Sequence, residues 1–151
     1  MPQKAALGGK TAMKKVIVSA CLIGENCKYN GGNNKSEAVL RFVKDREVIA
    51  VCPERLAGLG VPRIPIEIRN GETVDQNGRS VEKVLRRAVD EIVSGIEPCG
   101  IDCAILKSRS PTCGVKEVYD GTFSGKLVPG MGMLASTLRD IGVKIIDSED
   151  I

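Results

Sequence analysis

Histidine is absent from the 151 residues of this sequence. Its absence excludes a Ser-His or Cys-His nucleophile, a histidine-ligated zinc site and an imidazole general base. Acid–base chemistry therefore falls to carboxylates, lysines, tyrosines or thiols. A bound metal ion must be held by cysteine, with or without a carboxylate.

Aromatic residues are almost as scarce, with no tryptophan, two tyrosines and two phenylalanines. So few aromatic rings provide no stacking platform for single-stranded nucleic acid. The net charge of +3 includes four lysines that precede most of the first predicted strand, so the remainder is slightly acidic (3 − 4 = −1). The sequence therefore does not support binding to polymeric DNA or RNA.

Long apolar runs are missing too: no stretch approaches the ~20 residues of a membrane span, and residues 1–12 lack the apolar core of a secretory signal. We therefore expect a soluble, cytoplasmic protein with no membrane partner. In such a compartment the six cysteines stay reduced, which disfavours three disulfides. The length suits one domain, 13–151, preceded by a polar segment, 1–12, that we interpret as a disordered arm, an added tail or a misplaced start.

Strand and helix patterns alternate along this domain. The predicted strands of the sheet are 15–20, 47–51, 103–107 and 143–146. The predicted helices are 36–44, 81–94 and 133–140. Repeated β-α-β order with short connections predicts a three-layer, Rossmann-like α/β fold with a parallel sheet. The stretch 53–65 is too irregular to be an element and too apolar to be a solvated linker.

Helix ends and turns also have recognisable signals. Ser36 or Asn34 is placed to cap the first helix, Ser80 to cap the second, and Gly95 to end the second in the left-handed conformation. Asn70-Gly71 predicts a hairpin between 66–68 and 73–74. Asp120-Gly121 predicts another hairpin between 115–119 and 122–124. The hairpins would decorate the central sheet.

Three cysteines stand just past the apolar runs that predict strands: Cys21, Cys52 and Cys113. If the strands are parallel, all three thiols project from the carboxyl edge of one sheet, where ligands bind in such folds. Three convergent thiolates without histidine indicate a sulfur-ligated metal centre with one open coordination position.

Each motif also has a simpler interpretation. Cys21 could be a buried apolar residue, because free cysteine is often buried. Pro53 stiffens the turn that holds Glu54 two residues from Cys52, although Glu54 could equally be a surface carboxylate. The loop 108–114, SRSPTCG, is the strongest signal, because it combines a turn-fixing proline, hydroxyl groups, a basic residue and a thiol.

Six ordered segments carry a resemblance to a known family: SACLIG (19–24), CKYNG (27–31), VCPE (51–54), GLGVPR (58–63), AILK (104–107) and SRSPTCG (108–114). Together they resemble the small bacterial thiouracil desulfidase family over nearly the whole chain. The mild departures from the family pattern are Lys28, Asn30, Ala57 and Thr112, and they concern substrate identity rather than the cofactor.

The resemblance implies a [4Fe–4S] cluster held by Cys21, Cys52 and Cys113. It also implies a catalytic Glu54 and a substrate-site Ser110. An open iron is a soft Lewis acid, suited to the sulfur of a thiolated nucleobase or nucleotide. Water could then add to the polarised C=S carbon, with Glu54 moving the proton and Ser110 hydrogen-bonding the base or the developing oxyanion. The expected activity is hydrolytic conversion of thiouracil to uracil and sulfide.

The other three cysteines leave alternatives open. Cys27 could be a fourth ligand, a sulfur relay or part of a pocket wall. Cys99 and Cys103 form a C-x3-C pair, for which packing is the favoured role of Cys103. A closed four-cysteine site would favour a non-catalytic zinc or cluster module, and a third alternative is a cluster-borne sulfur carrier.

Three basic residues and one glycine pair could recognise an anion. Arg63, Lys107 and Arg109 could contact the phosphate of a thionucleotide, or only pair with surface carboxylates. Gly130 and Gly132, which precede the last predicted helix, could present free N–H groups to an anion.

Overall fold

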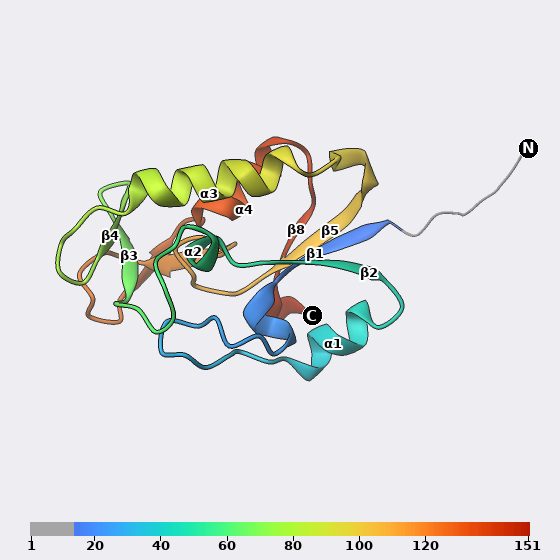
Figure 1. Ribbon diagram of the computed structural model, residues 1–151, viewed down its shortest axis with the longest axis horizontal. Coiled ribbons are helices and arrows are strands. Elements are labelled where there is room, and N and C mark those ends of the chain that lie inside the picture. Colours follow the sequence, from blue (N-terminus) through green and yellow to red (C-terminus); the bar gives the residue numbers. More distant parts are fainter. Residues whose placement is uncertain (1–13) are drawn as a thin grey trace, which may run out of the picture.

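Four parallel strands form the central sheet of the protein, whose computed structural model describes residues 14–151 (Figure 1). Across the sheet they are β2 (Glu47–Val51), β1 (Lys15–Ser19), β5 (Ile101–Leu106) and β8 (Ile145–Asp147). The chain first adds β2 on one side of β1 and then β5 on the other, so the order reverses between β1 and β5. Ligands bind beside such a reversal, at the carboxyl edge of the sheet. The segment 1–12 lies outside the described residues.

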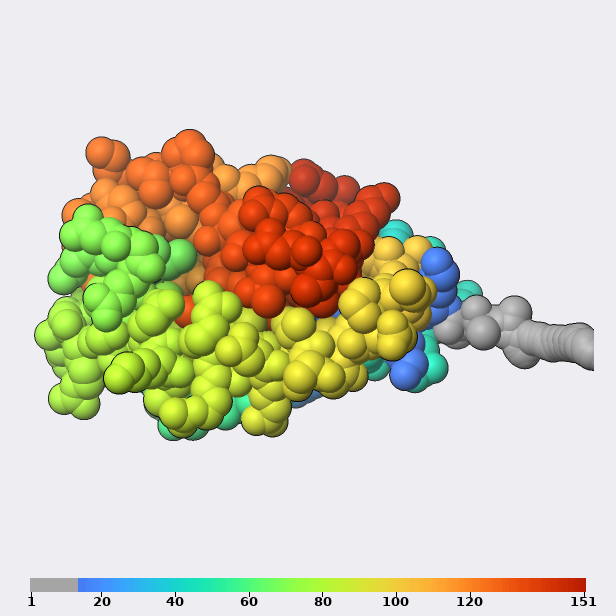
Figure 2. All heavy atoms as spheres, turned by 90° about the horizontal axis from the view of Figure 1, so that it is seen from above, coloured from blue at the N-terminus to red at the C-terminus, as the bar shows by residue number. Residues whose placement is uncertain are grey.

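Helices cover both faces of this sheet. Helices α3 (Glu82–Ser94) and α4 (Met133–Asp140) lie side by side on one face (Figure 2), and α1 (Glu37–Val43) covers the other. Side chains of β1 alternate between the faces, so Ile17 packs in the larger apolar cluster with α3 and α4, and Val18 packs in the smaller cluster with α1. The predicted three-layer α/β fold with a parallel sheet is confirmed.

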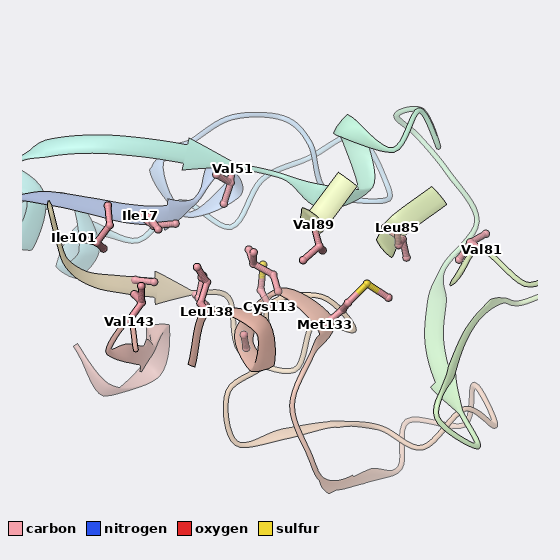
Figure 3. Packing of buried hydrophobic residues seen from close by; sticks show 14 residues of the cluster. Ile17, Val51, Val81, Leu85, Val89, Ile101, Cys113, Met133, Leu138 and Val143 are labelled. Atoms are coloured by element: carbon pink, nitrogen blue, oxygen red, sulfur yellow. The ribbon is translucent and has the colours of Figure 1, made fainter. Parts of the chain in front are cut away.

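The larger apolar cluster reaches the carboxyl edge of the sheet. Leu85, Val89 and Leu138 are completely buried in it. Cys113 belongs to the same cluster and lies between Leu138 and Met133 in Figure 3. Full burial of such side chains stabilises the fold by about 1.5–3 kcal/mol each. The core therefore anchors the loop that carries Cys113.

The helix ends match the predicted caps only in part. Ser36, rather than Asn34, caps α1, because its hydroxyl accepts a hydrogen bond from the N–H three residues later, at 3.2 Å. Helix α3 begins one residue later than predicted, so Ser80 lies one residue before the N-cap Val81. Its hydroxyl still accepts a hydrogen bond from the N–H of Glu82, the first residue of the helix, at 3.4 Å. Gly95 has φ −87°, so the predicted left-handed stop is wrong.

The first predicted hairpin is confirmed. Strands β3 (Ile66–Arg69) and β4 (Glu72–Asp75) pair antiparallel around Asn70 and Gly71. Both turn residues have positive φ, 53° and 80°, as a two-residue hairpin turn requires.

The second hairpin differs from the prediction. Strand β6 (Glu117–Tyr119) pairs with β7 (Leu127–Pro129), so 122–124 belongs to a loop, 120–126, rather than to a strand. The side chain of Asp120 accepts hydrogen bonds from the N–H and hydroxyl groups of Thr122, which makes a local turn. The Asp-Gly signal thus marks the start of a longer loop.

Several boundaries also move. The stretch 53–65, predicted to lack an element, contains the one-turn helix α2 (Pro53–Leu56). Strand β2 lies at the sheet edge and is only partly buried, β5 begins two residues before its predicted start, and β8 two residues after its predicted start. No helix within residues 14–151 is long and apolar enough to cross a membrane.

Candidate functional site

Three chain segments leave the carboxyl edge of the sheet next to one another. A short 3-10 helix (Ala20–Ile23) follows β1 and carries Cys21, Cys52 follows β2, and the loop after β5 carries Cys113. The structure brings the three thiols together on the wall of one cavity of about 530 Å³. Since β1, β2 and β5 are mutually parallel, this convergence follows directly from the sheet.

The protein environment raises the pKa of two of these thiols, Cys113 and Cys21. Burial raises the pKa of Cys113 to about 12, and the nearby Glu54 carboxylate adds to the effect, which outweighs hydrogen bonds from Ser19 and Thr112. Burial also raises the pKa of Cys21, although its sulfur accepts a hydrogen bond from the Asn34 amide at 3.4 Å. A thiol that must ionise to bind metal therefore releases a proton when it does so.

A fourth thiol, Cys27, lines the same cavity. It is buried, and the Cys52 thiol lies 4.0 Å from its backbone carbonyl oxygen. Burial and the neighbouring Cys52 raise the pKa of Cys27 to about 12. Cys27 is therefore part of the cavity wall, as one of its three interpretations predicted.

The Glu54 carboxylate is held at both of its oxygen atoms. Thr112 donates its hydroxyl hydrogen to Oε1 at 2.8 Å, and the Arg63 guanidinium lies 3.4 Å from Oε2. The side chains of Glu54 and Arg63 are only 13% and 7% exposed. Arg63 also donates to the carbonyl oxygens of Gly60 and Cys27, each at 3.0 Å. Glu54 is thus a fixed cavity carboxylate rather than a surface one.

Ser110 organises the loop that carries Cys113. Its hydroxyl oxygen accepts hydrogen bonds from the backbone N–H groups of Thr112 and Cys113, at 3.1 and 3.0 Å. It also lies 3.1 Å from the hydroxyl of Thr112, which in turn bonds Glu54. Thr112 is fully buried, and sequence reasoning noted it only as a departure from the family pattern. The sequence signal that could have identified Thr112 as a site residue is its position in the SRSPTCG motif, next to Cys113.

Helix α4 docks its N-terminus directly on this loop. The N–H groups of Leu134 and Ala135 donate to the carbonyl oxygen of Thr112, at 2.8 and 3.2 Å, and that of Gly132 donates to Gly114 at 2.8 Å. A Cβ on Gly132 would lie 2.4 Å from the backbone of Thr112, so this close approach needs glycine. The suggestion of free N–H groups for an anion is therefore wrong at these positions, because the loop occupies them.

The remaining basic candidates have different surroundings. Lys107 lines the cavity, and its ammonium group donates to the carbonyl and the hydroxyl of Ser108 at 3.0 Å. Burial, together with the charge of Arg109, lowers the pKa of Lys107. Arg109 also lines the cavity but pairs with the exposed Glu149 at 2.8 Å, which fits the surface-pair interpretation.

Cys99 and Cys103 lie away from the site. Cys103 is buried within β5 in the smaller apolar cluster, and Cys99 is exposed. Neither lines the cavity. Packing explains the burial of Cys103, as predicted.

Within residues 14–151, no group of three or more histidine, cysteine, aspartate or glutamate side chains could hold one ion. Thiolates on a single tetrahedral zinc lie about 3.8 Å apart, as the Zn–S bond length requires. Thiolates on separate irons of a cubane lie about 6–7 Å apart, a spacing compatible with one cavity.

The parallel sheet, the thiol-lined cavity at its edge and the clamped carboxylate together define a class: α/β proteins with a cavity lined by thiols at the carboxyl edge of the sheet. A model of the 2-thiouracil desulfurase family matches residues 16–150, and the chain belongs to this family. The family expectation from the sequence is thereby confirmed, and with it that the protein is an enzyme.

Two known proteins are similar over nearly the whole chain. An uncharacterised protein of Bacillus subtilis, YbbK, is 32% identical over 146 residues, which cover 90% of this chain and 97% of that protein. The solved structure of the [4Fe-4S]-dependent thiouracil desulfidase TudS superposes with a TM-score of 0.83 at 31% identity, covering 91% of this chain and 93% of that one.

Proposed function

We propose that this enzyme removes sulfur from a thiolated pyrimidine by hydrolysis, forming uracil and sulfide, with a [4Fe–4S] cluster in the cavity at the sheet edge. One observation carries the proposal: thiols from three strand ends and the clamped Glu54 carboxylate share one cavity. Family membership and the likeness to TudS support the cluster and the substrate class.

Cys21, Cys52 and Cys113 are the proposed ligands. Their thiols come from three strand ends and line one cavity, which supports ligation of three separate irons by one thiolate each. When bound, the cluster would supply one iron without a protein ligand, a soft Lewis acid that takes a thiocarbonyl sulfur and polarises its bond to carbon.

Glu54 is the proposed proton carrier. It accepts one proton from water as the water oxygen adds to the ring carbon, and passes this proton to the sulfur. It then takes the second proton from the resulting hydroxyl group as the carbon–sulfur bond breaks and passes it to the departing sulfur, so that C=S and H₂O become C=O and H₂S. Thr112 and Arg63 fix the carboxylate for both transfers. Neither step transfers a net electron.

Ser110 is proposed to orient the ring or to hydrogen-bond the developing oxyanion. It lines the cavity, and two backbone N–H groups fix its oxygen. A cavity of about 530 Å³ suits a small molecule rather than a polymer. Lys107 lines the same cavity, where it would face the phosphate of a thionucleotide.

The test is conversion of 2-thiouracil or 4-thiouracil by anaerobically prepared protein without added reductant. We expect equal amounts of uracil and sulfide. A protein that carries the cluster and desulfurises no thiolated nucleobase would contradict the enzymatic reaction proposed here.

One observation favours a second candidate, a closed structural or sulfur-carrying site. Cys27 is a buried fourth thiol beside Cys52 on the cavity wall, and four thiolates would leave no open iron. Loss of the cluster absorbance in Cys27→Ser would support this candidate. Retention of the absorbance would support the open site.

A further inference from the structure

Three of the four aromatic side chains in this chain line the cavity that holds the thiols. They are Tyr29, Tyr119 and Phe123, whereas Phe42 packs against the smaller apolar cluster on the α1 face. Aromatic residues make up only 3% of the sequence, so their concentration at one cavity is specific to that place. Aromatic walls bind flat rings, because offset stacking on a planar π-face is favourable.

Phe123 has a backbone conformation that bulky residues rarely adopt. Its φ is 58°, within the left-handed region that usually requires glycine. Such a conformation persists only where the surrounding structure holds it, and it is concentrated at functional sites. The contacts that hold this loop in place are therefore informative.

Strand β3 supplies those contacts. The buried Glu67 carboxylate accepts hydrogen bonds from the N–H groups of both Gly121 and Phe123 through one oxygen, each at 3.0 Å. Arg69 donates to the carbonyl oxygen of Gly121 at 2.9 Å, and its guanidinium lies 5.9 Å from the centre of the Phe123 ring. In Figure 1 the β3–β4 hairpin and the orange β6–β7 segment lie together at one end of the molecule.

The fit of the loop against β3 is close. A Cβ on Gly121 would lie 2.7 Å from both the Cβ of Arg69 and the carbonyl oxygen of Ile68, so only glycine allows this approach. Both hydrogen bonds of the buried Glu67 carboxylate go to this loop. Glu67 therefore sets the position of Phe123 at the cavity.

We propose that Phe123, positioned by Glu67, is a stacking wall that makes this site selective for planar pyrimidine rings over puckered ones. The proposal rests on the proposed function, because it assigns the part of the same cavity that recognises the ring rather than the sulfur. Phe123 contacts the substrate in this account, and Glu67 is a positioning residue that acts through the loop. Stacking of a base on an aromatic side chain strengthens binding about 5- to 150-fold.

The test compares two unreactive ligands that share their polar groups: uracil, which is flat, and 5,6-dihydrouracil, whose saturated ring is puckered. Calorimetry on anaerobically isolated protein measures their dissociation constants. We expect the parent to prefer uracil by about tenfold or more and Phe123→Leu to lose most of this preference. Phe42→Leu, the matched control on the other face, should keep the parent preference.

Glu67 is tested in the same assay. Glu67→Gln retains an oxygen that accepts the two N–H bonds and should keep the preference for uracil, whereas Glu67→Ala should lose it. If Glu67→Ala does not fold, Arg69→Leu removes the hydrogen bond to Gly121 from an exposed position and should reduce the preference. If the folded Glu67→Ala or Arg69→Leu variant prefers uracil over 5,6-dihydrouracil as strongly as the parent does, the positioning role of Glu67 is overturned.

The stacking wall is overturned if the parent does not bind uracil, if it binds both ligands equally, or if Phe123→Leu weakens both ligands by the same factor. None of these results depends on turnover. A parent that prefers uracil yet desulfurises no thiouracil would overturn the proposed reaction and leave the stacking wall intact, so the two failures can be told apart.

Discussion

Cys103 and Cys113 are equally hidden but lie in different parts of the molecule. Their exposed fractions are 3% and 5%, and burial raises the pKa of both thiols. Cys103 lies within β5 among apolar side chains of the α1 face. Cys113 lies beyond the carboxyl end of the same strand, beside Glu54, Ser19 and Thr112. The comparison shows that burial alone does not separate the proposed ligand Cys113 from the packing residue Cys103, whereas their positions along the strand differ.

The largest expected difference concerns cluster binding. Cys113→Ser should abolish the iron–sulfur absorbance, as should Cys21→Ser and Cys52→Ser, because each removes one of only three ligands. Cys103→Ala should retain the absorbance and lose only packing energy. Iron and sulfide counts on anaerobically purified variants measure the contrast. A folded Cys103→Ala variant without iron–sulfur absorbance would contradict the assignment of Cys103 as a packing residue.

The next effect separates chemistry from cluster assembly. Glu54→Gln keeps the shape of the side chain but cannot carry a proton, so turnover of thiouracil should fall by about 10²–10⁴ while the cluster stays intact. The rate of uracil formation per cluster measures this loss. A variant as fast as the parent would remove Glu54 from the reaction.

A smaller loss is expected at the hydroxyl groups beside Cys113. Ser110→Ala should lower turnover by about 10–10³-fold, since it removes one oriented hydrogen bond and two backbone partners from the loop. Thr112→Val leaves the shape and removes the hydroxyl that donates to Glu54 and contacts Ser110, so we expect about a tenfold loss in kcat with KM unchanged. A change in KM alone would place Thr112 in substrate binding instead.

Sequence patterns predicted the parts of the fold that depend on neighbouring residues. Strand β2 and helix α4 have their predicted bounds, because apolar periodicity is a local signal. The Asp120-Gly121 turn misled, because the 120–126 loop is shaped by Glu67, more than fifty residues away. The Asp-Gly pattern is a local signal, whereas the conformation of this loop depends on a distant residue.

The same division applies to the site. Strand ends indicated Cys21, Cys52 and Cys113, because parallel strands share one carboxyl edge. The contact from Thr112 to Glu54 joins residues 58 apart in sequence, and only the folded chain shows it. The sequence predicts a phosphate or surface contact for Arg63, whereas the structure pairs Arg63 with the half-buried Glu54.

The smallest expected difference concerns the rates at which individual thiols are alkylated. Because a raised pKa lowers the thiolate fraction at any given pH, Cys103 should resist alkylation at about pH 8, as should Cys27 with its pKa of about 12. The exposed Cys99 should be labelled first. Mass spectrometry of the cluster-loaded protein after brief iodoacetamide treatment locates the label. Rapid labelling of Cys103 would show that β5 opens readily.

The most direct measurement is made on a protein that keeps only the three strand-end thiols. The triple variant Cys27→Ser, Cys99→Ser, Cys103→Ala retains Cys21, Cys52 and Cys113. We predict about four irons and four sulfides per chain, with the parent's conversion of thiouracil to uracil. A folded triple variant that binds no cluster would contradict the account, because it would show that the strand-end thiols alone do not make the site.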